Sequence, residues 1–583
     1  MMPHRDLLRP YFAASRNRIL AGLASLMLVD LLQLAIPRVI KHAVDDLASS
    51  EAQAGRLAAQ AGTILALAVL VGLFRYVWRL CLLGTSRRIE QGLRQRLFAH
   101  LQRLSAAAFD RTATGDLMAR ATHDLQQIRM AAGMGIVALN DAVVMGAAAI
   151  AFMATIDPVL TAWALLPMPL VAFGTRVFSR RMHRRYQAVQ ASFAALTEVI
   201  RERIVGVRLI QAHNLQRFEA GRVEASSREF LEENLKLVRV TGVFSPLMLL
   251  LTNVSLVLVL LVGGRRTILA AITPGDLVAF ITYLGLLAWP MMALGWVTNL
   301  VQRGKASLER VAAVLAEVPE IASRPGALPL PRPRGEIVFE AVSFRYPGSA
   351  GRPALEGIDL AVPAGAVLGI VGPPGAGKST LLSLVPRLYD PTAGRIRLDG
   401  FDLRDLRLED LRRAVCLLPQ EAFLFSGTLR DNLTLGDPGI SLRRLEEAAA
   451  AAALLETVRG LPAGFDTVVG ERGIMLSGGQ KQRVALARCL LADTPVLLLD
   501  DPVSQVDFET AAAIVRALRA LTGRKTIFIA SHRIAAVEFA DRIVVLDGGR
   551  LVARGTHREL LRENPYYAQA FRLQEIEEAA HAA

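Results

Sequence analysis

The sequence predicts an all-α membrane domain of six transmembrane helices with long cytoplasmic extensions, followed by an α/β domain of the P-loop type with a helical subdomain. Three observations lead to this fold class. The mean hydropathy of the 583 residues is +0.36 although 21% of them are charged. Six apolar runs fall in the first half of the chain, and a glycine-rich loop follows a strand-like run in the second half. Three scattered cysteines exclude a disulfide framework and a zinc cluster.

Each apolar run is close to the roughly 20 residues that cross the hydrocarbon core of a bilayer as a helix. Six such runs in succession are not expected of buried helices in a soluble protein. The predicted spans are about 19–40, 57–83, 133–155, 158–178, 243–262 and 277–300. The transmembrane domain that contains them is predicted to cover residues 1–320.

Arginine is concentrated in two long polar segments, 85–130 and 179–240, and before the first span. Basic residues favour the cytoplasmic side of a membrane, so these segments and both termini are expected to be cytoplasmic. Loops that face anionic lipid also account for the net charge of +14, and no nucleic-acid partner is expected. Apolar positions at helical spacing predict that the helices continue into the cytoplasm, with turnarounds at 109–115 and 212–218.

A proline-rich stretch at 325–334 marks the end of the membrane domain. Residues 321–335 are predicted to form a linker. In residues 336–583, short β-type runs alternate with helices, which is typical of an α/β domain with a largely parallel sheet. This part is expected to be one soluble domain in the cytoplasm.

A phosphate-binding loop is explicit in the sequence. The strand-like run 366–371 is followed by GPPGAGKST at 372–380 and then by a helical run, which is the context that a P-loop requires. Backbone N–H groups of such a loop, at a helix N-terminus, bind phosphate oxygens. Lys378 is expected to neutralise the β- and γ-phosphates, and Ser379 to ligate Mg²⁺. The predicted phosphate-binding residues are Gly372, Gly375, Gly377, Lys378, Ser379 and Thr380.

A second apolar strand, 495–499, ends in Asp500 and Asp501. Asp500 is expected to hold Mg²⁺, directly or through water, opposite Ser379. A polar turn or a helix N-cap is the alternative for an acidic pair after a strand. The P-loop earlier in the chain favours the metal role.

The run LSGGQ at 476–480 lies between these motifs, and with it the motifs resemble those of the ATP-binding-cassette (ABC) family. The whole chain resembles an ABC exporter half-transporter, in which six spans are fused to one nucleotide-binding domain. The resemblance implies ATP and Mg²⁺ as cofactors and an ATPase coupled to transport. The signature residues would be Ser477, Gly478, Gly479 and Gln480. They lie at the start of a helix, so their N–H groups can bind a γ-phosphate.

Four further residues match positions of the family pattern. The resemblance assigns adenine stacking to Tyr346, the Q-loop and a metal contact to Gln420, the D-loop acid to Asp507 and the switch histidine to His532. Taken singly, each of these side chains would more simply be a core, surface or strand-end residue. Their order and spacing around the P-loop and the signature favour the functional assignment.

The resemblance also implies a dimer, because in this family each ATP lies between one P-loop and the signature of the partner. Residues 109–115 and 214–218 resemble coupling helices. In the family, such helices transmit the movement of the closing nucleotide-binding domains to the membrane helices. The expected partners are a second half-transporter, membrane lipid, and a hydrophobic small-molecule or lipid substrate. The expected location is a bacterial cytoplasmic (inner) membrane.

One position departs from the family pattern: the residue after the Mg²⁺ aspartate is normally glutamate, and here it is Asp501. Its carboxylate is one methylene shorter, whereas a general base must lie within about 2.6–3.2 Å of the proton that it removes or reach it through one water. Asp501, with Pro502 and Gln505, predicts a site that binds ATP and hydrolyses it poorly. The catalytic set is predicted as Asp501, His532 and Gln420.

An impaired base beside an intact signature resembles one subunit of the bacterial multidrug-resistance-like heterodimeric exporters, whose partner chain would carry the glutamate. A homodimeric lipid flippase is the main alternative, since it shares the fold and most motifs. A gated channel or nonhydrolysing regulator would tolerate Asp501 but normally carries extra domains. Polar residues within the spans either line a substrate cavity or bond one another between helices. They are Asp30, Arg75, Arg79, Asn140 and Asp141.

Overall fold

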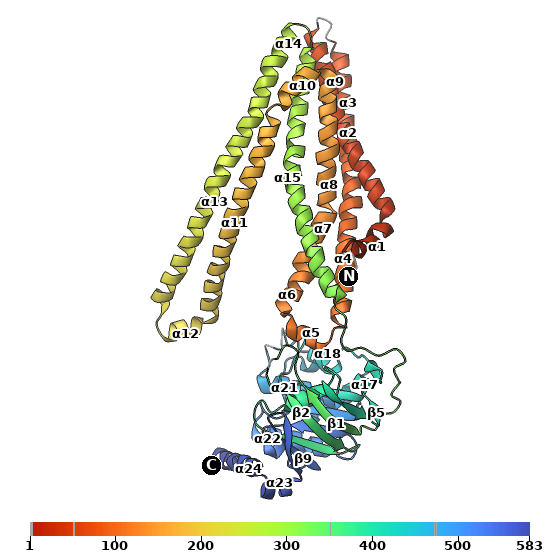
Figure 1. Cartoon of the computed structure of the whole chain (residues 1–583), viewed down its shortest axis with the longest axis vertical. Helices are drawn as coiled ribbons and strands as arrows, with labels where there is room; N and C mark the ends of the chain where they lie inside the picture. Colours follow the sequence, from red (N-terminus) through yellow and green to blue (C-terminus); the bar gives the residue numbers. More distant parts are fainter. Residues whose placement is uncertain (1–3, 50–52, 350, 471–472, 474, 583) are drawn as a thin grey trace. The chain divides into compact units, whose positions relative to one another are not determined.

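The computed structural model describes residues 4–49, 53–349, 351–470, 473 and 475–582 (Figure 1). The chain divides into two compact units. The first is built from Met1–His100 and Leu117–Ala316, and the second from Leu101–Asp116 and Glu317–Ala583. A short segment from within the membrane half of the sequence therefore belongs to the second unit.

The first unit is helical, and π-helical turns interrupt several of its long helices. The helices α2 and α3 pack together, as do α11 and α13, which run side by side in Figure 1. In chain order the elements are α1 (His4–Ala14), α2 (Arg16–Ala48), α3 (Ala54–Trp78), η1 (Arg79–Leu83), α4 (Gly84–Leu101), α6 (Thr114–Ala119), η2 (Arg120–Asp124), α7 (Leu125–Ala132), α8 (Met134–Asn140), η3 (Asp141–Met145), α9 (Gly146–Ile156), α10 (Pro158–Leu165), α11 (Met168–Val205), α12 (Val207–Ala212), α13 (Gln216–Leu258), η4 (Val259–Gly263), α14 (Gly264–Ile268) and α15 (Pro274–Ala316).

The helices of this unit agree with the predicted six-span membrane domain. Among the described residues, four helical stretches are long and apolar enough to cross a membrane: Arg16–Ala48, Ala54–Leu101, Thr114–Ile156 and Gln216–Ile268. The shorter apolar helices Pro158–Leu170 and Pro274–Leu287 coincide with the other two predicted spans. The first comprises α10 and the start of α11, and the second is the first part of the long helix α15.

The two predicted turnarounds contain short helices that begin earlier than predicted. The first, α5 (Ala106–Arg111), ends before the break at Thr112 and belongs to the second unit. The second, α12, ends before a turn in which Asn214 adopts a left-handed backbone with φ 54°. The prediction of a helix at 214–218 is wrong, because α13 already begins at Gln216.

The second unit contains two sheets. Four strands form a mainly antiparallel sheet in the order β2-β1-β4-β5, and six form a mainly parallel sheet in the order β10-β9-β3-β8-β7-β6. Their bounds are β1 (Ile337–Phe344), β2 (Leu355–Val362), β3 (Val367–Val371), β4 (Ala393–Leu398), β5 (Phe401–Asp402), β6 (Val415–Leu418), β7 (Val496–Asp500), β8 (Thr526–Ala530), β9 (Arg542–Asp547) and β10 (Arg550–Gly555).

Helices cover the parallel sheet and form a subdomain between β6 and β7, drawn in cyan to blue in Figure 1. The chain-order bounds are α16 (Lys378–Leu384), α17 (Leu408–Ala414), α18 (Leu429–Thr434), α19 (Leu442–Ala451), α20 (Leu455–Arg459), η5 (Gly464–Asp466), α21 (Gly478–Leu491), α22 (Phe508–Arg519), η7 (Ile534–Ala536), α23 (His557–Glu563) and α24 (Pro565–Ala582).

Three central strands of the parallel sheet position the site. Every residue of β3, β7 and β8 is buried, as expected of apolar strands covered on both faces. The parallel register of β8 with β3 and with β7 brings the carboxyl ends of all three strands to one edge. Ligands of open α/β sheets bind in the crevice outside this edge.

The segment that was predicted as a linker, residues 321–335, is hydrogen-bonded to the rest of the second unit. Leu328 N–H donates to the carbonyl of Asp405 at 2.8 Å, and Arg407 N–H donates to the carbonyl of Leu328 at 2.9 Å. Farther along, the carboxylate of Asp399 accepts the N–H groups of Arg334 and Glu336 at 2.7 and 2.9 Å. Residues 321–335, called the strap below, are therefore bonded along the second unit.

Candidate functional site

A pocket of about 210 Å³ lies at the carboxyl edge of β3, β7 and β8. Its lining residues are Pro374, Gly375, Lys378, Ser379, Gln420, Asp500, Asp501, Ala530, Ser531 and His532. All of these except Pro374, Ala530 and Ser531 were singled out from the sequence. Residues from four separate segments therefore converge where the sequence predicts a phosphate and metal site.

The P-loop connects β3 to α16 and depends on glycine at two positions. A Cβ on Gly372 would lie 2.1 Å from the carbonyl oxygen of Leu546, and Gly377 has φ +99° with a Cβ position 2.6 Å from the carbonyl oxygen of Ala354. The ammonium group of Lys378 donates to the carbonyls of Gly372 and Pro373 at 2.8 and 3.1 Å. Burial lowers the pKa of Lys378, and the carboxylates of Asp500 and Asp501 oppose that shift.

Asp500 is the last residue of β7 and faces Ser379 of the P-loop. Burial raises the pKa of Asp500, and the charge of Asp501 adds to the effect, whereas a hydrogen bond from Ser379 lowers it. A hydroxyl and a carboxylate are hard oxygen donors of the kind that Mg²⁺ prefers. Among the described residues, no group of three His, Cys, Asp or Glu side chains could hold a metal ion. Ser379 and Asp500 therefore fit Mg²⁺, which they would hold together with a bound nucleotide.

Asp501 has an unusual backbone and an engaged carboxylate. Its φ of 54° lies in the left-handed region, which is uncommon for residues other than glycine. Its N–H donates to the carbonyl of Ala530 at 2.7 Å, and its Oδ1 accepts the hydroxyl of Ser531 at 2.9 Å. Asp501 is 7% exposed and Ser531 is 0% exposed. The carboxylate at the predicted position of the general base therefore has a fixed, buried protein partner.

Gln482 connects the signature helix α21 to the backbone of Asp501. Its side-chain amide donates to the carbonyl of Asp501 and, at 3.1 Å, to the hydroxyl of Ser504. Its Oε1 accepts the N–H of Gln505 at 3.1 Å. Sequence reasoning did not identify Gln482 or Ser531. The available signals were their places, two residues after LSGGQ and immediately before His532.

The signature residues begin α21 and do not line this pocket. Ser477 is the N-cap, whose hydroxyl accepts the N–H of Gln480 at 3.3 Å, while Oε1 of Gln480 accepts the N–H of Ser477 at 2.9 Å. This reciprocal capping box satisfies two N–H groups at the start of the helix, where Ser477 and Gly478 are exposed. At Gly478 and Gly479, a Cβ would lie 2.4 and 2.3 Å from atoms of Gln505.

Asp507, the predicted D-loop acid, also lies outside the residues that line the pocket. It is the N-cap of α22, and its carboxylate accepts both the N–H and the hydroxyl of Thr510 at 2.9 Å. In this structure Asp507 therefore caps the N-terminus of α22.

Tyr346, the predicted adenine-stacking residue, lies beside the P-loop helix. Its hydroxyl shares a hydrogen bond of 3.1 Å with the hydroxyl of Thr380. Its ring packs edge-on against the ring of Tyr389, with 5.3 Å between centroids. Tyr389 in turn donates a hydrogen bond of 2.7 Å to Asp110 in α5. Burial raises the pKa of Tyr389, and the hydrogen bond to Asp110 and its charge add to the shift.

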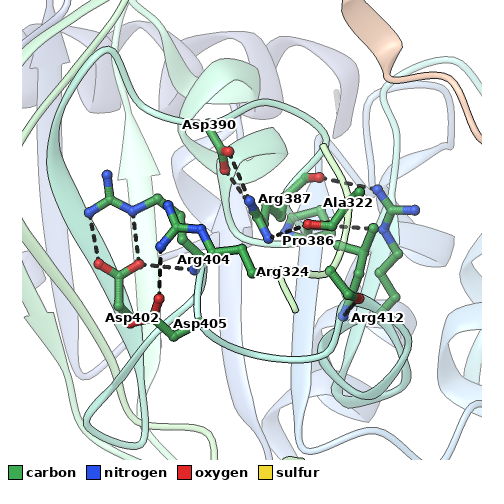
Figure 2. Close-up of polar contacts among 11 residues, drawn as sticks. Ala322, Arg324, Pro386, Arg387, Asp390, Asp402, Arg404, Asp405 and Arg412 are labelled. Atoms are coloured by element: carbon green, nitrogen blue, oxygen red, sulfur yellow. Dashed lines mark hydrogen bonds and ion pairs between the residues drawn. The ribbon is translucent and has the colours of Figure 1, made fainter. Parts of the chain in front are cut away.

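The loop that carries Tyr389 is held by a buried arginine (Figure 2). Arg387 has φ 54°, is 3% exposed and donates to both carboxylate oxygens of Asp390 at 2.7 and 3.0 Å. Arg412 donates to the carbonyls of Pro386 and Arg387 at 3.3 and 3.1 Å. Buried charges are stable only when paired and hydrogen-bonded, so these bonds fix the loop.

The same corner binds the strap and α5. Arg387 also donates to the carbonyl of Ala322 in the strap at 3.5 Å, and Arg324 pairs with Asp405 at 2.9 Å (Figure 2). Arg111 of α5 pairs with Glu320 at 2.7 Å. The loop after α16, the strap and α5 are therefore one connected polar network within the second unit.

Known proteins match both halves of the chain. The family model described as "ABC transporter transmembrane region" matches residues 19–291, and the model "ABC transporter" matches residues 355–504. The chain is 37% identical over 570 residues to the multidrug resistance-like ATP-binding protein MdlA of Escherichia coli, covering 98% of this chain and 96% of that protein. It is 36% identical to an ATP-dependent lipid A-core flippase of Nitrosococcus oceani, with 87% and 85% covered.

A solved structure of a bacterial Atm1-family ABC exporter with ATP bound superposes with a TM-score of 0.75 and 27% identity, covering 96% of this chain and 99% of that chain. The predicted fold class, a helical membrane domain followed by an α/β nucleotide-binding domain, is thereby confirmed. The chain belongs to the ABC exporters with fused transmembrane and nucleotide-binding domains, and it is an ATPase coupled to transport.

Proposed function

We propose that this chain is one half of a heterodimeric exporter that moves amphipathic or hydrophobic molecules across the bacterial cytoplasmic membrane. Both termini and the nucleotide-binding domain face the cytoplasm. The ATP site built on its own P-loop binds ATP and hydrolyses it slowly, and the partner supplies the competent site. The observation that carries this proposal is the engaged, short carboxylate of Asp501.

The nucleotide roles follow the residues that line the pocket. Lys378 neutralises the β- and γ-phosphates, and the N–H groups of the P-loop bind their oxygens. Ser379, Asp500 and Gln420 hold Mg²⁺, which supplies charge neutralisation for the phosphates when it is bound. Tyr346 stacks on adenine, and His532 contacts the γ-phosphate. The fit of hydroxyl and carboxylate donors around a buried lysine supports these assignments.

Three features of Asp501 argue against efficient proton abstraction. Its side chain is one methylene shorter than glutamate, so it reaches less far into the pocket. Its Oδ1 already accepts the Ser531 hydroxyl at 2.9 Å, so this oxygen is held by a protein partner and is not free to accept a proton from water. Its backbone is fixed at φ 54° by Ala530 and Gln482, which prevents a compensating shift. A misplacement of about 1 Å can cost on the order of 100-fold in rate.

The signature sequence LSGGQ at 476–480 matches the family pattern, whereas the position of Asp501 departs from it. Ser477 caps a helix whose exposed N-terminus can bind a phosphate, and the two glycines after it leave room for Gln505. In an exporter dimer this signature completes the partner's ATP site. Turnover would therefore depend on this chain's Ser477 and on the partner's glutamate.

The proposed substrates are amphipathic because the relatives are named for multidrug resistance and for lipid A-core transport. Two of the polar residues within the spans bond each other, since Asn140 donates to Asp30 at 2.9 Å. Trp289 donates to Asp141 at 3.4 Å. These bonds favour the interhelical explanation for those residues.

A homodimeric lipid flippase is the second candidate, favoured by flippase relatives that are 35–37% identical. Reconstitution in vesicles separates the two proposals. The chain should export a hydrophobic dye with ATP only when the partner half-transporter is present. Lipid translocation by the chain alone, with full ATPase activity, would support the homodimeric flippase and reject the heterodimer.

A further inference from the structure

The C-terminal helix α24 is hydrogen-bonded to the loop that carries His532. The side-chain amide of Gln574 donates to the carbonyl of His532 at 2.7 Å and accepts the N–H of Ile534 at 2.7 Å. One planar amide thus binds the main chain on both sides of Arg533. A two-point bond of this kind fixes the orientation of a loop as well as its position.

The rest of the loop is held from the opposite direction. Arg533 N–H donates to the hydroxyl of Ser531 at 3.0 Å, and that hydroxyl donates to Asp501. The guanidinium of Arg533 donates to the carbonyl of Val506 in the D-loop at 3.2 Å. The loop is therefore held at three places: by Asp501 through Ser531, by the carbonyl of Val506 in the D-loop, and by Gln574 of α24.

The register of α24 is fixed where it meets the domain. Tyr567 is 0% exposed, and its hydroxyl forms a hydrogen bond of 2.8 Å with Nδ1 of His557. The ring of Phe571 packs against His557 with 5.1 Å between centroids. Tyr567, Phe571 and Gln574 follow the i, i+4, i+7 spacing of one helix face. Two aromatic anchors therefore place Gln574 at the His532 loop.

We infer that Gln574 is a positioning residue for His532: it holds the loop so that His532 stays at the nucleotide pocket. The inference rests on the proposed function in that His532 contacts the γ-phosphate. Gln574 lies outside the residues that line the pocket and acts only through the loop. Without its amide, the carbonyl of His532 and the N–H of Ile534 turn to solvent, and the imidazole loses its fixed place beside the phosphates.

Binding of ATP and ADP tests this role without relying on hydrolysis. The assembled complex is used with the partner's P-loop lysine replaced, so that only this chain's site binds nucleotide. Gln574→Met removes both hydrogen bonds but keeps the length of the side chain. Gln569→Met is the matched control, because Gln569 is an exposed glutamine on the same helix. Affinities for ATP and ADP are measured by competition with a fluorescent nucleotide analogue.

Gln574→Met should weaken ATP binding about tenfold, the effect of losing one to two hydrogen bonds, and leave ADP binding within about twofold. Gln569→Met should change neither. Gln574→Glu keeps the acceptor for Ile534 and loses the donor for His532, so its effect on ATP should be intermediate. An equal loss of ATP and ADP affinity would mean a merely structural role, and unchanged ATP affinity would mean no role; either result overturns the inference.

His532→Ala in the same assay separates this inference from the proposed function. If His532→Ala weakens ATP binding selectively and Gln574→Met does not, the positioning role is wrong and the assignment of His532 stands. If His532→Ala leaves the preference for ATP over ADP unchanged, the phosphate contact of His532 is wrong, and the inference is overturned with it.

Discussion

The hydroxyl of Tyr389 donates a hydrogen bond of 2.7 Å to the carboxylate of Asp110 in α5. On its other side, the Tyr389 ring packs edge-on against Tyr346, which is hydrogen-bonded to Thr380 of the P-loop helix. Short contacts thus connect the P-loop helix, through Tyr346 and Tyr389, to a helix inserted from the membrane half of the sequence. α5 leads along the chain to α4 and α6, so this connection is suited to pass a nucleotide-dependent movement to the membrane helices.

Tyr389→Phe should uncouple transport from ATP hydrolysis. The variant keeps the ring against Tyr346 and loses the bond to Asp110, which at about 1 kcal/mol corresponds to roughly a fivefold effect. ATP affinity should stay unchanged, while substrate-stimulated ATPase activity and transport per ATP fall about fivefold. Tyr566→Phe, at an exposed tyrosine of α24, is the control. Normal substrate stimulation in Tyr389→Phe would show that this bond does not carry the coupling.

The same bond predicts how coupling depends on pH. The pKa of Tyr389 is raised above its usual value near 10, so the phenol keeps its proton, and the bond is lost only as the pH rises through that higher value. The ratio of transport to hydrolysis should be flat from pH 7 to about pH 10.5 in the wild-type complex, a range in which an ordinary tyrosine loses its proton. A decline in that ratio with the titration of an ordinary tyrosine would contradict the raised pKa.

Lys378→Ala should weaken ATP binding at this chain's own site. The ammonium group is already placed in the P-loop by the carbonyls of Gly372 and Pro373, and a hydrogen bond to a charged group contributes about 1.5–3 kcal/mol. Photocrosslinking of an ATP analogue to this subunit should therefore fall by roughly 10- to 100-fold. Unchanged crosslinking would show that Lys378 does not bind the phosphates.

The orientation in the membrane can be tested with single cysteines. Cysteines at Ser49 and Leu269, both exposed at predicted outer loops, should react with a membrane-impermeant reagent in intact cells. A cysteine at the exposed Gln211 in α12 should react only after the cells are opened. The natural cysteines are replaced first as a control. External labelling at Gln211 would reverse the proposed topology.

The parts of the fold that the sequence predicts well are those with a strong local signal. Apolar length defines the spans, and the P-loop needs both its strand and its glycines, so Lys378, Ser379 and Asp500 could be brought together from the sequence. The turn at Asn214 lies within the predicted turnaround 212–218, but the short helix α12 lies before it, because Gly206 ends the preceding helix and a new helix starts at Val207. Neither Gly206 nor Asn214 interrupts the polar pattern by which the helix was recognised.

The parts that were missed depend on tertiary contacts. Ser531, Gln482 and Gln574 are ordinary polar residues until the fold places them against Asp501 and the His532 loop. The strap was predicted as a linker because prolines predict a break, whereas its bonds to Asp399 and Asp405 involve residues far along the chain. Local patterns carry no information about such partners.

In the proposed heterodimer, Asp501 is a poor base in the ATP site built on this chain's own P-loop. The signature of this chain completes the other ATP site, which is built on the P-loop of the partner. Steady-state phosphate release is measured on the purified complex with the natural partner, for three variants side by side. Asp501→Asn should keep most of the activity. Ser477→Ala should lower it more, because it removes a phosphate contact at the competent site, and glutamine in place of the partner's glutamate should nearly abolish it. If Asp501→Asn alone eliminates turnover, Asp501 is a working base, and the exporter is a homodimeric pump.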